Sequence, residues 1–440
     1  MNIYKRVLGA VLLTAMACTP AAAEELVLSR EQCLEIALRD NPTVRVADME
    51  IKKVDYSKKE VIAGLFPSVD FSANYQRSIE LQTIRMNMGG ESQKLKMGSD
   101  NTWNMGFAAS VPLIAPTLWK SISISKDQIL ANMESARASR LDLVNNVNKA
   151  YYALLLAIDS HKVVKENYDI AVMNAGIYEK QFKAGTASEY DVLRSSVQVK
   201  NIEPELLQAD IAIKQCQLQL KVLMGISTDT DIRPSSTLTD YQKDMYTYPA
   251  GADTSIAGNT SLRSLDIQKK ILDKNVDLKK FAWLPTLGAS FNLSWLSLSN
   301  GSPLKNQEFN PYCNIGISLS VPVFSGGARY YGLKQAQVQR KELELQREDL
   351  VNSLNMQVDL AIDNINREAR QIATSEEGVR QAKKAHDIMQ KSFEIGAASY
   401  LDLRDSELAD TQAQLAYLQA IYNYLVSTSE LDTLLGKNID

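Results

Sequence analysis

The stretch Phe182–Asp191, FKAGTASEYD, recurs 211 positions later as Phe393–Asp402, FEIGAASYLD. The same offset relates residues 143–225 to residues 354–436 without a gap. A register kept over that length indicates two copies of one structural unit rather than a shared short motif. In both copies a glycine and then a serine interrupt a long helical pattern, so each stretch predicts a turn between two helices.

The first half of each unit repeats as well, with an offset of 218. This offset pairs Asp48 with Asp266, and it pairs Phe66-Pro67 with Leu284-Pro285 just after a helical pattern ends. Ser29 is the candidate N-cap of the helix that opens repeat one at Leu28. The two offsets predict repeat one at about 28–225, a linker at 226–257 and repeat two at about 258–436.

After each of these prolines the hydrophobic period changes from helical to two. In the first such stretch, Val69, Phe71, Ala73 and Tyr75 alternate with Ser, Asp and Asn. Strands with an apolar face and a face of Ser, Asn and Gly are the structure that this alternation predicts. The predicted strands lie at about 67–77, 103–113, 285–296 and 312–323.

Two architectures are compatible with these strands. One is a soluble β-sandwich. The other is a share of a membrane barrel, since each run has the ~9–11 residues that a transmembrane strand needs. The polar faces favour the barrel, and so does the separation of the strands into two hairpins, because a lone hairpin is marginal in water. Four strands cannot close a barrel with a useful lumen, so several chains would contribute. Residues 77–102 and 297–310 are then predicted to be exposed loops.

Long helices connect the predicted strands to the turns. Residues 118–182 contain no proline, and their first glycine is Gly176. Residues 330–393 carry apolar side chains at heptad-like spacing, which predicts a coiled-coil seam. Return helices are expected at 188–225 and 399–436, with Pro204 interrupting the first of them.

The N-terminus has the pattern of an export signal. Lys5 and Arg6 precede an apolar run and then three alanines before Glu24, which predicts a signal peptide at 1–23 and a mature chain at 24–440. Cys18 is the alternative processing point, as a lipidation site. No later segment approaches the ~20 apolar residues of a membrane helix. The charged fraction of 23% and the formal net charge of −4 do not indicate a nucleic-acid partner.

Taken together, the pattern resembles the TolC family of outer-membrane efflux channels. The likeness covers essentially all of the mature chain, and the order of its motifs is more specific than any one of them. The residues that carry it are Leu34–Leu38, Asn41-Pro42, Phe66-Pro67, Val321–Gly327, the paired Gly-x-x-Ser-x-x-Asp turns and Leu434–Gly436.

This resemblance implies a mainly α-helical homotrimer whose three chains form one 12-stranded β-barrel and an α-helical periplasmic tunnel. It also implies a location in the bacterial outer membrane, in contact with its lipid. The partners would be a periplasmic adaptor (membrane fusion protein) and an inner-membrane transporter of the RND, ABC or MFS type. The chain would then be a passive exit duct of a tripartite efflux or type I secretion system. The competing hypothesis is an exported coiled-coil scaffold or adhesin without a pore.

In the family the turns lie at the periplasmic mouth. The resemblance therefore implies that the adaptor contacts the turn residues, and that paired carboxylates line a constriction, in which they would repel one another and titrate as a coupled set. Ala398 stands where the best-known relatives have an arginine that ties the closed helices, and Arg194 and Arg404 are the candidate substitutes. The implied adaptor contacts are Gly185, Thr186, Gly396 and Ala397; the turn caps are Ser188 and Ser399; the gate carboxylates are Asp402, Asp405 and Asp191.

Nothing in the sequence indicates an enzyme or a cofactor site. His161 and His386 occupy different positions in the two repeats, and neither has a Cys or His partner at ligand spacing. Both histidines are therefore interpreted as residues of helix seams.

Overall fold

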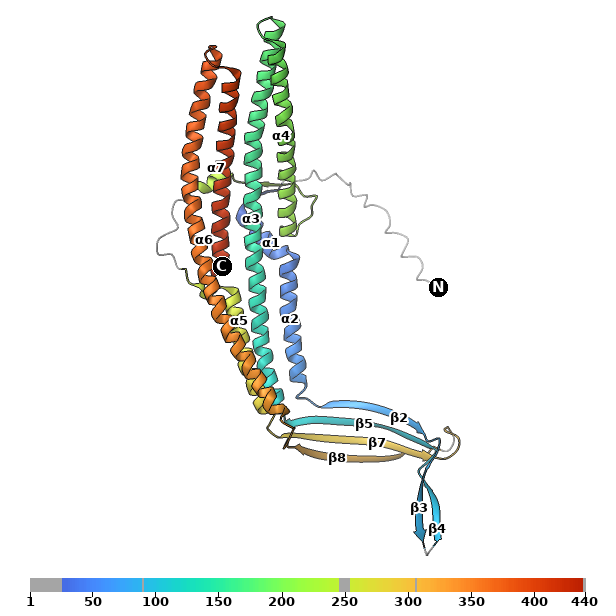
Figure 1. Cartoon of the computed structure of the whole chain (residues 1–440). Coiled ribbons are helices and arrows are strands. Elements are labelled where there is room, and N and C mark those ends of the chain that lie inside the picture. The colour runs from blue at the N-terminus through green and yellow to red at the C-terminus, as the bar shows by residue number, and fades with distance from the viewer. Residues whose placement is uncertain (1–25, 89–90, 245–253, 305–306, 438–440) are drawn as a thin grey trace, which may run out of the picture. The chain divides into compact units, whose positions relative to one another are not determined.

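The computed structural model describes residues 26–88, 91–244, 254–304 and 307–437, so the predicted signal peptide and Cys18 lie outside the described residues (Figure 1). Its helices are α1 (Arg30–Asp40), α2 (Pro42–Ala63), α3 (Pro116–Lys183), α4 (Glu189–Met224), α5 (Thr260–Phe281), α6 (Ala328–Glu394) and α7 (Tyr400–Leu435). Its strands are β1 (Leu26–Leu28), β2 (Ser68–Arg77), β3 (Gln82–Met88), β4 (Glu91–Met97), β5 (Asn101–Ile114), β6 (Ile232–Pro234), β7 (Thr286–Ser299) and β8 (Asn310–Ser320).

The chain divides into two compact units. The first contains α1, α4 and α7 with the parts of α3 and α6 that follow residues 139 and 355. The second contains α5, nearly all of α2, the sheet and the preceding parts of α3 and α6. Both copies of the repeat therefore contribute to both units.

Two helical hairpins, α3–α4 and α6–α7, make up most of the first unit. Val147, Tyr151 and Ile421 are fully buried in it. A polar layer joins the hairpins: Asn148 donates to the hydroxyl of Ser429 at 3.3 Å, and that hydroxyl donates to Asn145 at 3.0 Å. Such a layer defines one register between the helices, because any slip would leave buried polar groups unpaired. The predicted seam of α6 is confirmed, with Leu354, Val358, Ile365 and Ile372 all buried.

The predicted linker contains short ordered elements among its described residues. Its strand β6 pairs in parallel with β1, so Leu26 lies opposite Ile232. A 3-10 helix, η1 (Leu238–Asp244), follows it, and a second, η2 (Ile256–Gly258), ends the segment.

The cap at Ser29 is confirmed, since its hydroxyl accepts from the backbone of Gln32 and the Gln32 side chain accepts from the backbone of Ser29. The helix α1 accordingly begins at Arg30, directly after this cap.

The helix α4 runs unbroken through Pro204, contrary to the predicted interruption. It ends at Gly225, whose φ of +70° is a conformation that side chains resist. A Cβ built there would lie 2.8 Å from the carbonyl oxygen of Asp40. Gly225 thus lets α4 end against the α1–α2 junction, where Asn41 donates to the Leu223 carbonyl at 2.7 Å.

Replacing Gly225 with alanine is expected to lower the Tm by about 5 °C. The left-handed backbone costs about 1–3 kcal/mol for an L-residue, and the close approach adds strain. Gly176→Ala is the matched control, because Gly176 lies inside α3 with open space around a built Cβ. That control should hold or raise the Tm, since alanine favours helices over glycine. Equal thermal unfolding of the two variants would contradict this account.

The sheet of the second unit is antiparallel, with the strand order β2-β5-β7-β8. All four predicted strands are confirmed, although β8 ends at Ser320, before the predicted end. Pro112 lies within β5, where the register shifts between Pro112 and Ile114. The predicted loop 77–102 is largely a second hairpin, β3–β4.

The two faces of the sheet differ in chemistry, as predicted. On the polar face, Ser68 and Ser110 lie 3.0 Å apart, and Asn292 donates to Asn314 at 3.0 Å. Gly106 on this face permits close strand packing, because a Cβ would lie 2.5 Å from the Leu293 carbonyl. The other face is apolar and exposed in the single chain. Its residues include Val69, Phe71, Phe107, Phe291, Ile315, Ile317 and Leu319.

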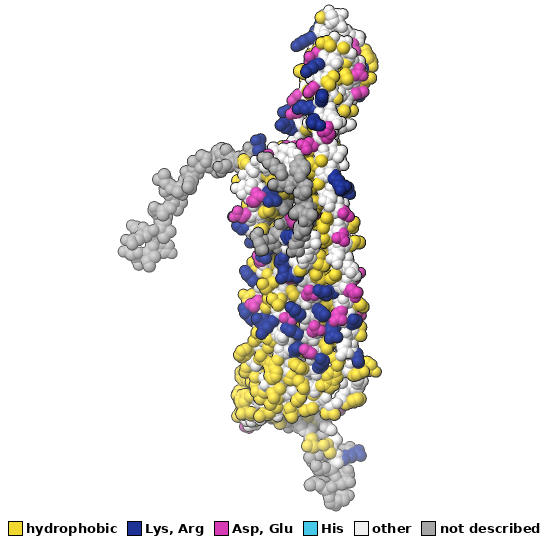
Figure 2. Space-filling model, turned by 90° about the vertical axis from the view of Figure 1, so that its left-hand side faces the viewer, with side chains coloured by type: hydrophobic (Ala, Val, Ile, Leu, Met, Phe, Trp, Pro, Cys, Tyr) yellow, Lys and Arg dark blue, Asp and Glu magenta, His cyan; other side chains and the backbone are white. Residues whose placement is uncertain are grey.

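Hydrophobic side chains gather at the sheet end of the second unit, whereas charged side chains lie over its helices (Figure 2). Ion pairs join those helices: Lys120 to Asp277 at 2.8 Å, and Lys274 to Asp127 at 2.6 Å. An exposed apolar face of this extent marks contact with lipid or with another chain.

Candidate functional site: the hairpin turns

The two hairpin turns have nearly the same backbone geometry. Gly185 and Gly396 both have φ of +76°. In the first turn the backbone N–H of Thr186 donates to Gln181 at 2.9 Å, and in the second that of Ala397 donates to Ser392 at 2.7 Å. These bonds close the C-termini of α3 and α6 with the glycine in the left-handed conformation. In each hairpin the predicted turn residues therefore lie at the exposed end.

Both predicted caps are confirmed, and they involve two of the predicted gate carboxylates. Ser399 accepts from the backbone of Asp402 at 3.3 Å, while the Asp402 carboxylate accepts from the backbone of Ser399 at 3.1 Å and from its hydroxyl at 2.6 Å. Ser188 and Asp191 form the same reciprocal capping box. The serine bonds hold the pKa of both carboxyls below the ordinary range. Within one chain, Asp402 is thus a cap residue, and the pKa-raising effect of a ring remains a prediction for the assembly.

Asp405 differs from Asp402 in its surroundings. It lies three residues further along the exposed surface of α7, and its side chain is 62% exposed. The guanidinium of Arg404 lies 3.8 Å from its carboxylate. Asp405 is therefore the acidic residue of the pair whose carboxylate takes no part in capping.

An aromatic cluster joins the two hairpins behind the turns. Tyr400 of α7 meets Tyr178 of α3 edge-to-face, with ring centroids 5.2 Å apart. Phe393 of α6 lies 6.5 Å from Tyr178 and 6.4 Å from Tyr400. The guanidinium of Arg194 in α4 lies over the Tyr400 ring at 5.4 Å. Arg194 and Arg404 were the candidate replacements for the arginine missing at position 398. Arg194 contacts the other hairpin through the Tyr400 ring, whereas Arg404 lies beside Asp405 of its own helix.

Further along the hairpins lies a polar cavity of about 50 Å³ that the sequence analysis missed. His386 lines it, together with Glu166 of α3 and Glu407 and Asp410 of α7. His386 is thus a seam residue, as interpreted, but one beside three carboxylates, of which Glu407 and Asp410 are half-buried and Glu166 is exposed. No local signal could reveal this, because the helices are brought together only by packing.

Among the described residues, no group of three or more His, Cys, Asp or Glu side chains is arranged to hold a metal ion. Within the same ranges no helix is both long and apolar enough to cross a membrane.

Known proteins share this fold. A sequence model of the outer membrane efflux protein family matches residues 33–226 and 252–437. The outer membrane protein TolC of Vibrio cholerae is 22% identical over 382 residues, which are 85% of this chain and 83% of TolC. The alkaline protease secretion protein AprF of Pseudomonas aeruginosa is 24% identical over 406 residues, 90% of this chain and 82% of AprF. The open-state MtrE outer membrane channel of Neisseria gonorrhoeae superposes with a TM-score of 0.73 at 18% identity, covering 93% of this chain and 89% of MtrE.

This chain has a strand pair in each repeat, a sheet with one apolar and one polar face, and paired helical hairpins. Together these features define the class of outer-membrane channel subunits with a helical extension. The chain belongs to the outer membrane efflux protein family. It is a TolC-type exit channel of the outer membrane, and the family is one of transport ducts rather than enzymes. The alternative of a pore-less scaffold or adhesin is not favoured.

Proposed function

We propose that three copies of the chain form one passive duct from the periplasm to the outside. The observation that carries this proposal is the two-faced, open sheet. Its edge strands, β2 and β8, have no partner among the described residues on their outer sides, and three such sheets joined edge to edge would satisfy those backbone groups. The apolar face would then meet lipid and the Ser–Asn face would line water.

The hairpin turns are the proposed periplasmic mouth. Gly185 and Thr186 with Gly396 and Ala397 are exposed there, and they would meet a periplasmic adaptor that connects the duct to an inner-membrane transporter of the RND, ABC or MFS type. The names of similar proteins cover secretion of a protease and efflux of cations, so the cargo would be selected by the transporter. Transport energy would come from that partner.

Three copies would bring Asp402 and Asp405 of each chain to the same constriction. Six carboxylates in one ring attract cations and repel one another. We propose that the aromatic cluster around Tyr400 holds each pair of hairpins in the closed arrangement against this repulsion. Arg194 takes the place of the missing arginine at residue 398 in that role.

The duct is tested by the purified full-length protein in detergent and in a planar bilayer. A threefold particle with single-channel conductance is the expected result. A matched control is Gly106→Val, which places a side chain against the Leu293 carbonyl and should prevent both the sheet and the conductance. A wild-type particle that is monomeric and without conductance would refute the proposal.

A further inference from the structure

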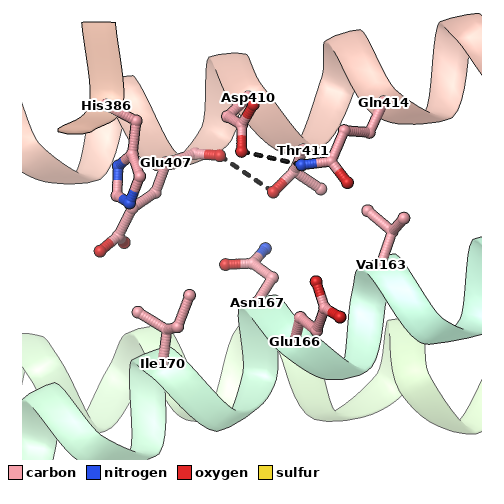
Figure 3. A pocket seen from close by; sticks show the side chains of 9 residues that line it. All are labelled: Val163, Glu166, Asn167, Ile170, His386, Glu407, Asp410, Thr411 and Gln414. Atoms are coloured by element: carbon pink, nitrogen blue, oxygen red, sulfur yellow. Dashed lines mark hydrogen bonds between the residues drawn. The ribbon is translucent and has the colours of Figure 1, made fainter. Parts of the chain in front are cut away.

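The cavity between the hairpins has no obvious part in forming a duct, yet its lining is unusual (Figure 3). Three carboxylates line it: Glu166 from α3, and Glu407 and Asp410 from α7. Among the described residues that line it there is no lysine or arginine, and His386 of α6 is the one basic side chain. Lys162 and Lys383 line the adjacent cavity instead. The remaining lining side chains are Val163, Asn167, Ile170, Thr411 and Gln414.

The hydrogen bonds around these carboxylates are incomplete. One Asp410 oxygen accepts from Gln414 at 2.8 Å, but the other, Oδ1, is buried and has no partner in the structure. Glu407 accepts a long bond of 3.3 Å from Asn174 of α3. An ionised carboxylate normally accepts several bonds, and an unpaired buried acceptor is costly. A protonated carboxyl would remove a buried charge and add a donor for such an acceptor.

We propose that this cavity is a proton-binding site, which takes up a proton as the periplasm acidifies and thereby tightens the contact between α3 and α7. Glu407 is the residue that binds the proton, since it is half-buried between α3 and α6 and its one hydrogen bond, from Asn174, is long. The electrostatics agree: burial raises the pKa of Glu407, and the nearby imidazole of His386 and the Asn174 amide offset only part of that.

The direction of the effect follows from linkage. If the hairpins separate, water reaches Glu407 and its pKa returns to the ordinary value. The packed arrangement therefore binds the proton more tightly than the separated one. Stability of the contact is greatest below the ordinary glutamate pKa and falls as the pH rises through the raised pKa. Acid thus favours packed hairpins, and neutral to alkaline pH loosens them.

The site exists in only one of the two repeats. At the offset of 211, Ala175, Ser196 and Val199 occupy the positions that correspond to His386, Glu407 and Asp410. Only the α6–α7 hairpin therefore carries these groups, and a response to pH would originate in that hairpin.

The test is hydrogen–deuterium exchange of the backbone of α7 in the full-length protein, compared between wild type and Glu407→Gln at the same pH from 5 to 8. Glutamine imitates the protonated carboxyl, so the variant should stay packed throughout. We expect the two proteins to exchange most alike at pH 5 and the wild type to exchange about tenfold faster than the variant at pH 8. The comparison at equal pH cancels the intrinsic effect of pH on exchange. Its readout is the contact itself, so it does not require the duct to conduct.

Glu394→Gln is the matched control, since Glu394 is exposed on α6 and accepts a hydrogen bond from Gln390 of the same helix. It should exchange as the wild type does at every pH. A second variant, His386→Gln, removes the group that favours the ionised carboxylate, so the loosening should shift to higher pH. The proposal is overturned if wild type and Glu407→Gln match at all pH values. It is equally overturned if Glu407→Gln does not fold and His386→Gln leaves the transition unmoved.

Discussion

Replacing Asp405 with asparagine is expected to weaken block of the open-mouthed duct by multivalent cations about tenfold. The reason is that threefold symmetry removes three negative charges from one constriction. A charge pair at ~4 Å in water is worth about 1 kcal/mol, more for a divalent ion, and salt screens part of it. A net loss of about 1.4 kcal/mol is a tenfold change in affinity. The measurement is single-channel conductance as a function of cation concentration, together with the reversal potential in a salt gradient.

The structure decides which carboxylate should be changed. The sequence groups Asp402 with Asp405 as gate carboxylates, so a joint variant would be Asp402→Ala with Asp405→Ala. Asp402, however, also caps α7 through Ser399, so that variant loses helix-cap stability as well as charge. Asp405→Asn alone keeps the cap and isolates the charge effect.

Asp387→Asn is the matched control, because Asp387 is exposed on α6 and lies outside the turn. It removes the same number of charges from the assembly but should leave block nearly unchanged. Block that is equally strong in wild type and in Asp405→Asn would show that this carboxylate does not face the passage.

Replacing Tyr400 with alanine is expected to raise the fraction of open channels about 30-fold. Tyr400 contacts Tyr178 and lies under Arg194, so its loss removes the main ring contacts between the hairpins. An aromatic pair contributes about 0.5–1.5 kcal/mol, and a cation–π contact about 0.5–1 kcal/mol at an exposed site. A combined loss of about 2 kcal/mol corresponds to a change of about 30-fold in the equilibrium constant. Open probability in a planar bilayer is the direct measurement.

Tyr190→Ala is the control for that experiment. Tyr190 lies at the start of the other return helix, and its side chain is 66% exposed. The loss of a tyrosine there should leave gating within twofold of the wild type. Arg194→Lys provides a finer test, because lysine keeps the charge but not the planar group that stacks on a ring. An unchanged open probability in Tyr400→Ala would remove the aromatic cluster from the closing mechanism.

Most of the local structure could be predicted because it depends on residues close together in the sequence. The turns at Gly185 and Gly396 need a residue in the left-handed backbone conformation, followed by an N-cap residue for the next helix. The glycine and the serine that meet these needs lie within a few positions of each other in the sequence. The strands were recognisable from their alternation. The β3–β4 hairpin was missed although Ile84, Met86 and Met88 alternate with polar residues and two glycines follow, which is a hairpin signal.

The pairing of β1 with β6 could not be predicted in the same way. Each strand has three residues, and about 200 positions separate them. Three residues carry too little periodicity to indicate a strand, and a parallel partner can lie anywhere in the chain. The prediction that Pro204 interrupts its helix was wrong for a related reason. The free-energy cost of a proline within a helix depends on neighbouring residues, and tertiary packing of α4 outweighs that cost.

By itself the sequence determined the repeat, the order of strands and helical hairpins, the two faces of the sheet and the chemistry of the turns. These properties depend on short-range periodicity and on backbone preferences that each residue carries with it. Only the tertiary structure decided that Arg194 stacks on Tyr400 and that Glu166 shares a cavity with Glu407. Those contacts join side chains from different helices, and their energies arise from burial and proximity that no stretch of sequence contains.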